Sequence, residues 1–440
     1  MANQPKNVLD GFWQQVQTNV NGPCYSKKVK GSWAVWNWTL VGEKVARLAS
    51  AFQRAGLKPG DRVAIFSENM PEWAITDFAC QTARLVSVPL YPTQTDAQVQ
   101  YILDHAGVKI AVVRGGARIH KVLALPGIEK VIEIEDGSGS SFKNPKVTSF
   151  EDFLTTGSVE ITKFAKDAAT LNLSELSTIV YTSGTTANPK GVMLSHGNTF
   201  AQSSMVGVRS TRTKNDVILS YLPLSHITER VNLFRQAISG YAIYFTQSID
   251  NVAADLKEVR PTSFVAVPRV WEKFQEAIQA KLRAAPAGKQ RIFAKTQDAG
   301  AKHFELRRNG HKVPFLLNLR VKILQRLVGR KLKAALGFDR THHYVSGAAP
   351  LSIETIKFFY SLGMPIVEGY GLSECAGASH INLPDSPVYG TVGPHIDGSE
   401  CKIASDGEIL IKGGHIFQGY YKDPEQTRET LIDGWLHTGD

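Results

Sequence analysis

The sequence contains little cysteine, and its cysteines form no pattern. Among its 440 residues are Cys24, Cys80, Cys375 and Cys401, with no Cys-x-x-Cys pair. Cysteines scattered in this way fit neither a structural zinc site nor a disulfide framework. They are typical of a protein that stays in a reducing compartment.

Long apolar runs are missing as well. The composition, 43% hydrophobic and 20% charged, is that of an ordinary globular chain. No stretch approaches the roughly 18 uninterrupted apolar residues that a membrane-spanning helix needs. Residues 1–15 also lack the apolar core of a secretory signal. We therefore expect a cytoplasmic protein.

Two common nucleotide-binding signatures are absent. No GxGxxG motif opens a helix. A Walker A loop has Gly before its Lys and Ser or Thr after it, whereas in YTSGTTANPKGV (181–192) Pro189 precedes Lys190 and Gly191 follows. This string still suits a phosphate, because its backbone N–H groups and hydroxyls can donate and its lysine adds positive charge. Composition alone would also fit a surface turn, but the ordered string favours phosphate binding.

The net charge of +10 is concentrated in one segment. Residues 281–340 contain 16 Lys and Arg against three acids. A helix here would carry an apolar stripe with cations opposite it. That helix either packs on its own lobe with a solvated basic face or docks on an anionic membrane, where each cation adds about 1 kcal/mol. Nucleic acid is not expected, because no binding motif accompanies the charge. The stripe is Leu317, Val321, Leu324, Val328, Leu332 and Ala335, and the cations opposite are Lys322, Arg326, Arg330 and Lys333.

Short β-branched runs alternate with helical patterns, which predicts an α/β fold with mainly parallel sheets. The chain is too long for one core, so we expect two stacked α/β lobes, 1–175 and 176–389, and a small β-rich lobe, 390–440. The second lobe includes the basic helical segment 281–340. Expected strands are 62–67, 109–113, 130–135, 178–182, 216–221, 264–267 and 343–346, and expected helices include 45–55 and 270–282.

The string at 181–192 resembles the signature of the adenylate-forming superfamily of acyl-CoA synthetases, luciferases and peptide-synthetase adenylation domains. VPLYPT (88–93) and the basic segment 319–337 are most similar to long-chain fatty acid–CoA ligases. The resemblance implies a ligase that activates a long-chain fatty acid with ATP as acyl-AMP and transfers it to coenzyme A. Further segments match in the family's order: LPLSHITER (222–230), VPRVWEK (267–273), VSGAAPL (345–351), EGYGLSE (368–374), GTVG (390–393), GEILIKG (407–413) and GWLHTGD (434–440).

The resemblance also implies an ATP site with Mg²⁺. Thr185 and Glu374 match the family's metal ligands, and a hard cation prefers such oxygen donors. Lys190 would neutralise phosphate charge, Tyr370 would lie against adenine, and Asp440 would accept the ribose hydroxyls. From the residues alone, Glu374 also fits a surface carboxylate and Tyr370 a core aromatic. The remaining nucleotide-binding positions are Thr182, Ser183, Gly184, Thr186, Gly369, Gly371 and Ser373.

An acyl site is implied beside it. His226 matches a ring near the acyl carboxylate, where it would position the acid, which is already ionised at neutral pH. Arg230 falls where long-chain relatives have a residue thought to gate the tunnel. A structural histidine and a solvated helix arginine stay open as alternatives. The small residues expected to line the tunnel are Gly347, Ala348, Ala349 and Pro350.

In the family a C-terminal lid with a catalytic lysine follows GWLHTGD. The 440 residues contain neither that hinge nor that lid, so we expect binding of ATP or acyl-AMP with poor turnover. Three other functions stay open: a fatty acyl-AMP ligase that serves a carrier protein, an acyl-CoA synthetase of another chain length, and a non-catalytic fatty acid or acyl-adenylate sensor. Oligomeric state is not predicted.

Overall fold

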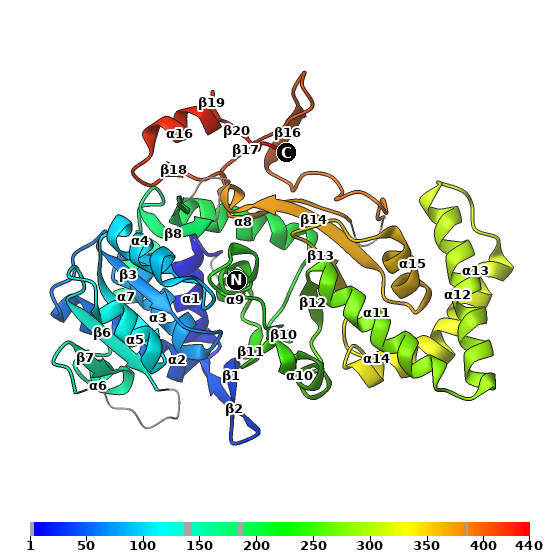
Figure 1. Cartoon of the computed structure of the whole chain (residues 1–440), viewed down its shortest axis with the longest axis horizontal. Helices are drawn as coiled ribbons and strands as arrows, with labels where there is room; N and C mark the ends of the chain where they lie inside the picture. The colour runs from blue at the N-terminus through cyan, green and yellow to red at the C-terminus, as the bar shows by residue number, and fades with distance from the viewer. Residues whose placement is uncertain (1–3, 136–142, 183–187, 384–385) are drawn as a thin grey trace.

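A computed structural model describes residues 4–135, 143–182, 188–383 and 386–440. In these residues the strands form two eight-stranded sheets and one four-stranded sheet (Figure 1). The α/β fold class predicted from the sequence is confirmed.

The first large sheet is parallel from β8 to β7 and closes with antiparallel β9 and β18. Side chains along β3 alternate between two cores: Val63 and Ile65 face one, Ala64 and Phe66 the other. Successive side chains face opposite sides of the sheet, and both sides are buried. The strands of this sheet therefore appear in the sequence as continuous apolar runs. In sheet order the strands are β18 (Gly419–Tyr420), β9 (Lys190–Ser195), β8 (Leu176–Thr182), β4 (Val86–Pro89), β3 (Arg62–Phe66), β5 (Val108–Arg114), β6 (Lys130–Ile134) and β7 (Val147–Ser149).

The second large sheet is parallel from β14 to β1, with antiparallel β15 and β2 at its edges. All seven expected strands are present in the two large sheets. The strands also cross the expected lobe boundary at 175, because β1 and β2 join the second sheet while β8 and β9 join the first. In order the strands are β15 (Gly377–Ile381), β14 (Ile366–Leu372), β13 (His343–Ser346), β12 (Ser263–Ala266), β10 (Val217–Ser220), β11 (Ala242–Phe245), β1 (Pro23–Val29) and β2 (Ser32–Asn37).

Helices lie between the sheets and on their outer faces. One core joins the inner faces of both sheets to α1 (Val8–Thr18), α2 (Trp38–Arg54), α3 (Pro71–Thr82) and α9 (Ile227–Ser239), together with α6 (Phe150–Thr155) and α7 (Ile161–Ala169). The outer face of the first sheet is covered by α4 (Asp96–Ala106) and α5 (Gly116–Leu123). The second sheet is covered by α10 (Val252–Val259), α11 (Pro268–Arg283), α12 (Ala287–Arg308), α14 (Arg330–Leu336) and α15 (Ile353–Ser361).

The basic segment lies at the outer edge of the second lobe, where α12 and α13 (Phe315–Leu324) stand side by side (Figure 1). Val321 of the predicted stripe is buried, and Val328 and Leu332 pack against the lobe's core. Ala335 is exposed, so the stripe does not face the core along its whole length. No helix in the described residues is long and apolar enough to cross a membrane.

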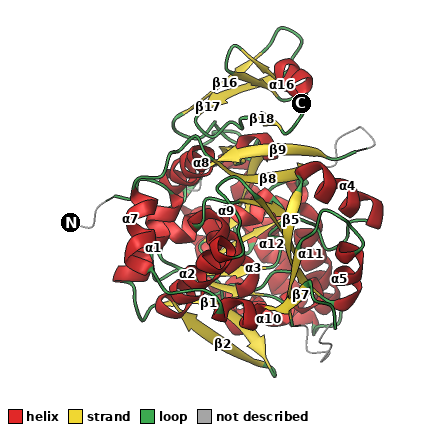
Figure 2. Cartoon of the chain, turned by 90° about the vertical axis from the view of Figure 1, so that its left-hand side faces the viewer, coloured by secondary structure: helices red, strands yellow, loops and turns green. Residues whose placement is uncertain are grey.

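A small antiparallel sheet projects from the body of the molecule near the C-terminus (Figure 2). Its presence confirms the small β-rich lobe of the predicted fold class. The short helix α16 (Pro424–Thr430) accompanies it. The strands are β16 (Ser399–Ile403), β17 (Ile409–Gly413), β20 (Trp435–His437) and β19 (Leu431–Ile432).

Candidate functional site

A cavity of about 360 Å³ opens where β12, β13 and β14 end, walled by α9 and α8 (His196–Arg209). In open α/β sheets, ligands bind outside the carboxyl ends of parallel strands. The chain therefore brings distant motifs to one place. The predicted site residues that line this cavity are Thr182, His226, Gly347, Ala348, Gly369, Tyr370, Gly371, Ser373 and Glu374.

The wall formed by β14 requires glycine. A Cβ atom added to Gly371 would lie 2.0 Å from the carbonyl oxygen of Gly377 on the neighbouring strand β15. Such a contact cannot be relieved by a side-chain rotation, because the opposing atom is backbone. Glycine here keeps the backbone of the two strands close and leaves the cavity wall smooth.

Tyr370 and Asp440 meet, although 70 residues separate them. The Tyr370 hydroxyl donates to Asp440 Oδ2 at 2.5 Å. Burial, followed by this carboxylate, raises the pKa of Tyr370, so the phenol stays protonated. The two residues predicted for adenine and ribose thus lie within one hydrogen bond of each other. Asp440 itself is not among the residues that line the cavity.

Glu374 and Lys190 are connected through Tyr420. The Tyr420 hydroxyl donates to Glu374 Oε1 at 2.8 Å, and Lys190 Nζ lies 5.3 Å from the centre of the same ring. Lys190 also donates to Gln426 Oε1 at 2.7 Å. Tyr420 was not predicted from the sequence. It joins a residue on the first sheet to one that lies between β14 and β15 of the second sheet.

The surroundings of Glu374 fit a hard cation. Among the described residues, the Tyr420 hydroxyl is the side-chain hydrogen-bond partner of this carboxylate, and it occupies Oε1. Glu374 forms no ion pair in that part of the chain, so Oε2 would be free to hold a divalent cation, which would supply positive charge beside the phosphates. Thr185, the second predicted metal ligand, lies outside the described residues, as do Ser183, Gly184 and Thr186.

His226 sits at the N-terminus of α9. Its Nδ1 accepts the backbone N–H of Thr228 at 3.2 Å, which leaves Nε2 as the protonated nitrogen. The Tyr91 ring stands edge-on at 6.4 Å. Burial lowers the pKa of His226, so the ring is neutral at pH 7. A neutral donor in the cavity suits a positioning role.

The structure places Arg230 away from this cavity. Its side chain is completely buried, so it is not a solvated helix arginine, and it does not line the cavity where a gate would stand. It forms a two-pronged ion pair with Asp77. Its remaining hydrogen bonds go to the hydroxyls of Thr178 at 2.7 Å and Ser87 at 2.6 Å, on the first sheet. Arg230 therefore ties α9 to α3 and the first sheet.

The expected acyl segment is only partly in the cavity. Gly347 and Ala348 line it, whereas Ala349 and Pro350 are exposed and do not. Ala348 has φ of +70°, a left-handed conformation that turns the chain sharply after β13. This turn is the physical reason that the four residues do not share one wall.

Several residues of the cavity were not predicted. They lie on one face of α9, at Ile227, Val231 and Arg235, and on the neighbouring α8, at Gln202. The three on α9 are four residues apart, a helical spacing that could have been recognised in the sequence. Arg212 also lines the cavity, from the loop after α8, and no pattern in the sequence marks it.

Comparison with protein-family models matches residues 12–421 to the AMP-binding enzyme family. The chain is 33% identical to the long-chain-fatty-acid–CoA ligase FadD15 of Mycobacterium bovis, over 99% of this chain and 72% of the relative. It is 31% identical to the human long-chain-fatty-acid–CoA ligase ACSBG2, over 99% of this chain and 67% of that protein.

Solved structures share the fold. The N-terminal domain of FACL13 from Mycobacterium tuberculosis superposes with a TM-score of 0.72 at 18% identity, over 99% of this chain and 96% of that one. The anthranilate CoA ligase AuaEII, solved with anthranoyl-AMP, superposes with a TM-score of 0.75 at 16% identity, over all of this chain and 76% of that one. With the family match and the cavity described above, these likenesses lead to one conclusion: the chain belongs to the AMP-binding enzyme family.

Proposed function

We propose that the protein activates a long-chain fatty acid with ATP as its acyl-adenylate and transfers the acyl group to coenzyme A. One observation carries the proposal: residues of the nucleotide type (Tyr370, Glu374) and of the acyl type (His226, Gly347) line the same cavity. The names of the two relatives support the substrate class.

The proposed reaction has two steps. The fatty carboxylate attacks the α-phosphate of ATP in line, pyrophosphate leaves, and a thiol then displaces AMP to give the thioester. Such transfers depend mostly on positioning and on neutralising phosphate charge. Lys190 carries one positive charge for that purpose, and neutral His226 can donate a hydrogen bond to the carboxylate. We propose that Glu374 would hold Mg²⁺, which would supply further positive charge against the phosphates.

The test is titration of Mg·ATP into the wild-type protein and the Glu374→Ala variant, together with pyrophosphate release over acids of increasing chain length, with and without coenzyme A. Glu400→Ala, an exposed carboxylate on β16, is the matched control. We expect only Glu374→Ala to lose Mg²⁺-dependent binding. Pyrophosphate release at the same rate with and without coenzyme A would favour the fatty acyl-AMP ligase. Acid binding without any nucleotide binding would favour the sensor.

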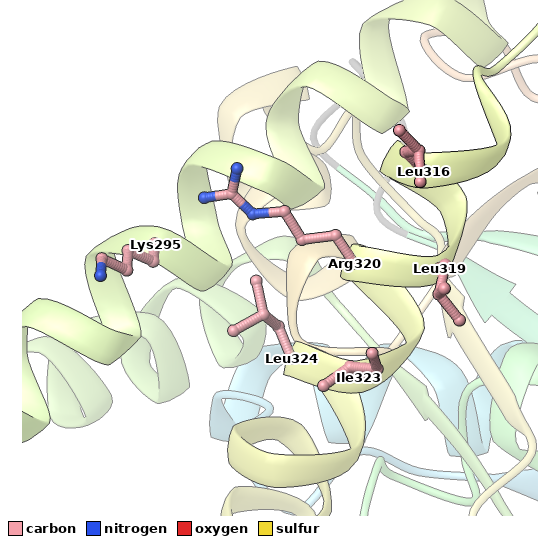
Figure 3. A pocket seen from close by; sticks show the side chains of 6 residues that line it. All are labelled: Lys295, Leu316, Leu319, Arg320, Ile323 and Leu324. Carbon is pink, nitrogen blue, oxygen red and sulfur yellow. The ribbon is translucent and has the colours of Figure 1, made fainter.

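We also propose that α13 rests on an anionic membrane surface. Phe315 and Leu316 are 76% and 77% exposed, and Leu319, Ile323 and Leu327 are exposed too. Figure 3 shows Leu316, Leu319 and Ile323 along α13, beside Arg320 and with Lys295 on α12. Exposed apolar side chains among cations suit the boundary between lipid headgroups and acyl chains. A substrate that partitions into lipid would be met there.

Vesicle binding tests this second proposal. We expect binding to phosphatidylserine vesicles that weakens with salt, and little binding to phosphatidylcholine vesicles. Leu316→Ser should reduce it, whereas Val208→Ser, which removes an exposed valine (66%) from α8, should not. Equal loss in both variants, or equal binding to neutral vesicles, would contradict the proposal.

A further inference from the structure

Two arginines line the cavity at the end remote from His226. Arg212 and Arg235 are 7% and 4% exposed, and both line the same cavity as the predicted site. Arg235 lies nine residues beyond His226 on α9, about 13 Å farther along the helix at 1.5 Å per residue. The walls of the cavity therefore contain a neutral imidazole and two guanidinium groups, of which Arg235 lies well beyond His226 along α9.

These guanidinium groups have neutral partners. Arg212 Nη1 donates to Asn232 Oδ1 at 2.9 Å and to the Tyr241 hydroxyl at 3.2 Å, and its Nη2 donates to Ser263 Oγ at 3.1 Å. Arg235 donates to the backbone carbonyl of Ser210. The arginine ion pairs found among the described residues involve other arginines. Two buried positive charges thus share one end of the cavity.

The nearby acids do not neutralise them. Glu229 is buried, and burial raises its pKa to about 8, so it is mostly protonated at pH 7. Asp216 accepts from the backbone N–H and hydroxyl of Thr213, and lies 3.6 Å from His342. Burial, and then the proximity of Arg212, lowers the pKa of Arg235 to about 9. Uncompensated charge of this kind is costly unless an anion arrives.

Two polar groups beside the cavity also lack partners. Arg212 Nε and both amide atoms of Gln202 are buried and have no hydrogen-bond partner among the described residues. Gln202 is 1% exposed and lines the cavity from α8. A purely hydrocarbon chain would leave both guanidinium charges without an anion. A ligand with an anionic far end would supply one.

We infer that Arg212 and Arg235 form an anion subsite that receives a carboxylate at the far end of the acyl chain, so that the preferred substrates are α,ω-dicarboxylic fatty acids. This inference rests on the proposed function and names its substrate class. An extended chain advances about 1.2 Å per bond, so 13 Å corresponds to roughly a dozen carbons. Dodecanedioate is therefore the probe that reaches from His226 to Arg235.

Binding by the wild-type protein is the primary test. Calorimetric titrations compare dodecanedioate, its monomethyl ester and dodecanoate, which differ only at the far end. Because hydrogen bonds to a charged group are strong, we expect dodecanedioate to bind on the order of tenfold or more tightly than the other two compounds. Equal or weaker binding of dodecanedioate would overturn the inference. Inorganic phosphate that occupies the cavity and is not displaced by dodecanedioate would also overturn the inference.

Arg235→Gln provides the second test. It should remove the preference for dodecanedioate and improve dodecanoate binding relative to it, while Arg235→Lys should retain part of the preference. Arg340→Gln, at an exposed position, is the matched control. An unchanged preference in Arg235→Gln would overturn the inference even if the wild-type result agreed.

The two proposals fail separately. Dodecanedioate binding without Mg·ATP binding would refute the proposed function and leave the anion subsite standing. Mg·ATP binding together with dodecanoate binding as tight as dodecanedioate binding would refute the subsite alone. Failure of both acids to bind would refute both.

Discussion

The ion pair between Arg230 and Asp77 should determine stability and leave chain-length preference unchanged. Both side chains are completely buried, and the guanidinium also donates to Thr178 and Ser87. Removal of one partner leaves the other charge buried and unpaired, which costs about 3–5 kcal/mol. We therefore expect Asp77→Asn and Arg230→Met each to lower the free energy of unfolding by about that amount.

Urea unfolding followed by tryptophan fluorescence measures the effect, because the Trp73 ring lies 5.5 Å from the guanidinium. The double variant Asp77→Leu/Arg230→Met should cost less than the two single changes together, since no charge is stranded. Glu175→Gln, which breaks the exposed pair with Arg84, is the control and should cost less than about 1 kcal/mol. A loss of unfolding free energy below about 1 kcal/mol for Arg230→Met, together with a changed chain-length preference, would refute this reasoning. It would favour a role for Arg230 in gating the acyl tunnel.

Three further outcomes are expected. Burial lowers the pKa of His196 to about 4, so the unfolded chain takes up the proton first and stability falls by on the order of 3 kcal/mol from pH 6.5 to pH 4. Urea midpoints should show a smaller fall for His196→Gln; an identical fall would contradict this. Tyr420→Phe should weaken Mg·ATP binding about tenfold or more, because Glu374 loses the donor that orients it. Titration measures this effect. An equal loss of ATP binding in the absence of Mg²⁺ would show that the orientation of Glu374 is not the cause. Gly371→Ala should lower the free energy of unfolding by about 1–3 kcal/mol, whereas Gly207→Ala, whose Cβ would meet nothing within 4 Å, should not.

The sequence predicted the strands well because their chemistry is local. Runs such as 62–67 and 343–346 are β-branched and apolar, and both are strands in the structure. Which sheet each strand joins depends on contacts between distant segments, so the expected boundary at 175 did not foresee that β1 and β2 pair with the second lobe. No local pattern encodes such an exchange.

The site residues that lie within recognisable sequence motifs could be predicted. Tyr370, Glu374 and His226 lie in strings that resemble the family, and all three line one cavity. Arg230 lies in such a string too, yet it pairs with Asp77, 153 residues away, and does not line the cavity. Helical spacing alone places it near His226, at i+4, so the sequence could not reveal this partner. The role of Tyr420 depends on a contact between segments 46 residues apart, which the sequence alone does not reveal.

The link through Tyr420 has a consequence for ligand-induced stabilisation. Lys190 belongs to the first sheet, and Glu374 lies between two strands of the second sheet. A nucleotide that contacts both residues would therefore link the two lobes. Its binding free energy would then be added to the interface between them, and at a hundredfold excess over the dissociation constant that gain is about 2.7 kcal/mol. Because one core already joins the two sheets, nucleotide binding should raise the urea midpoint of both lobes together.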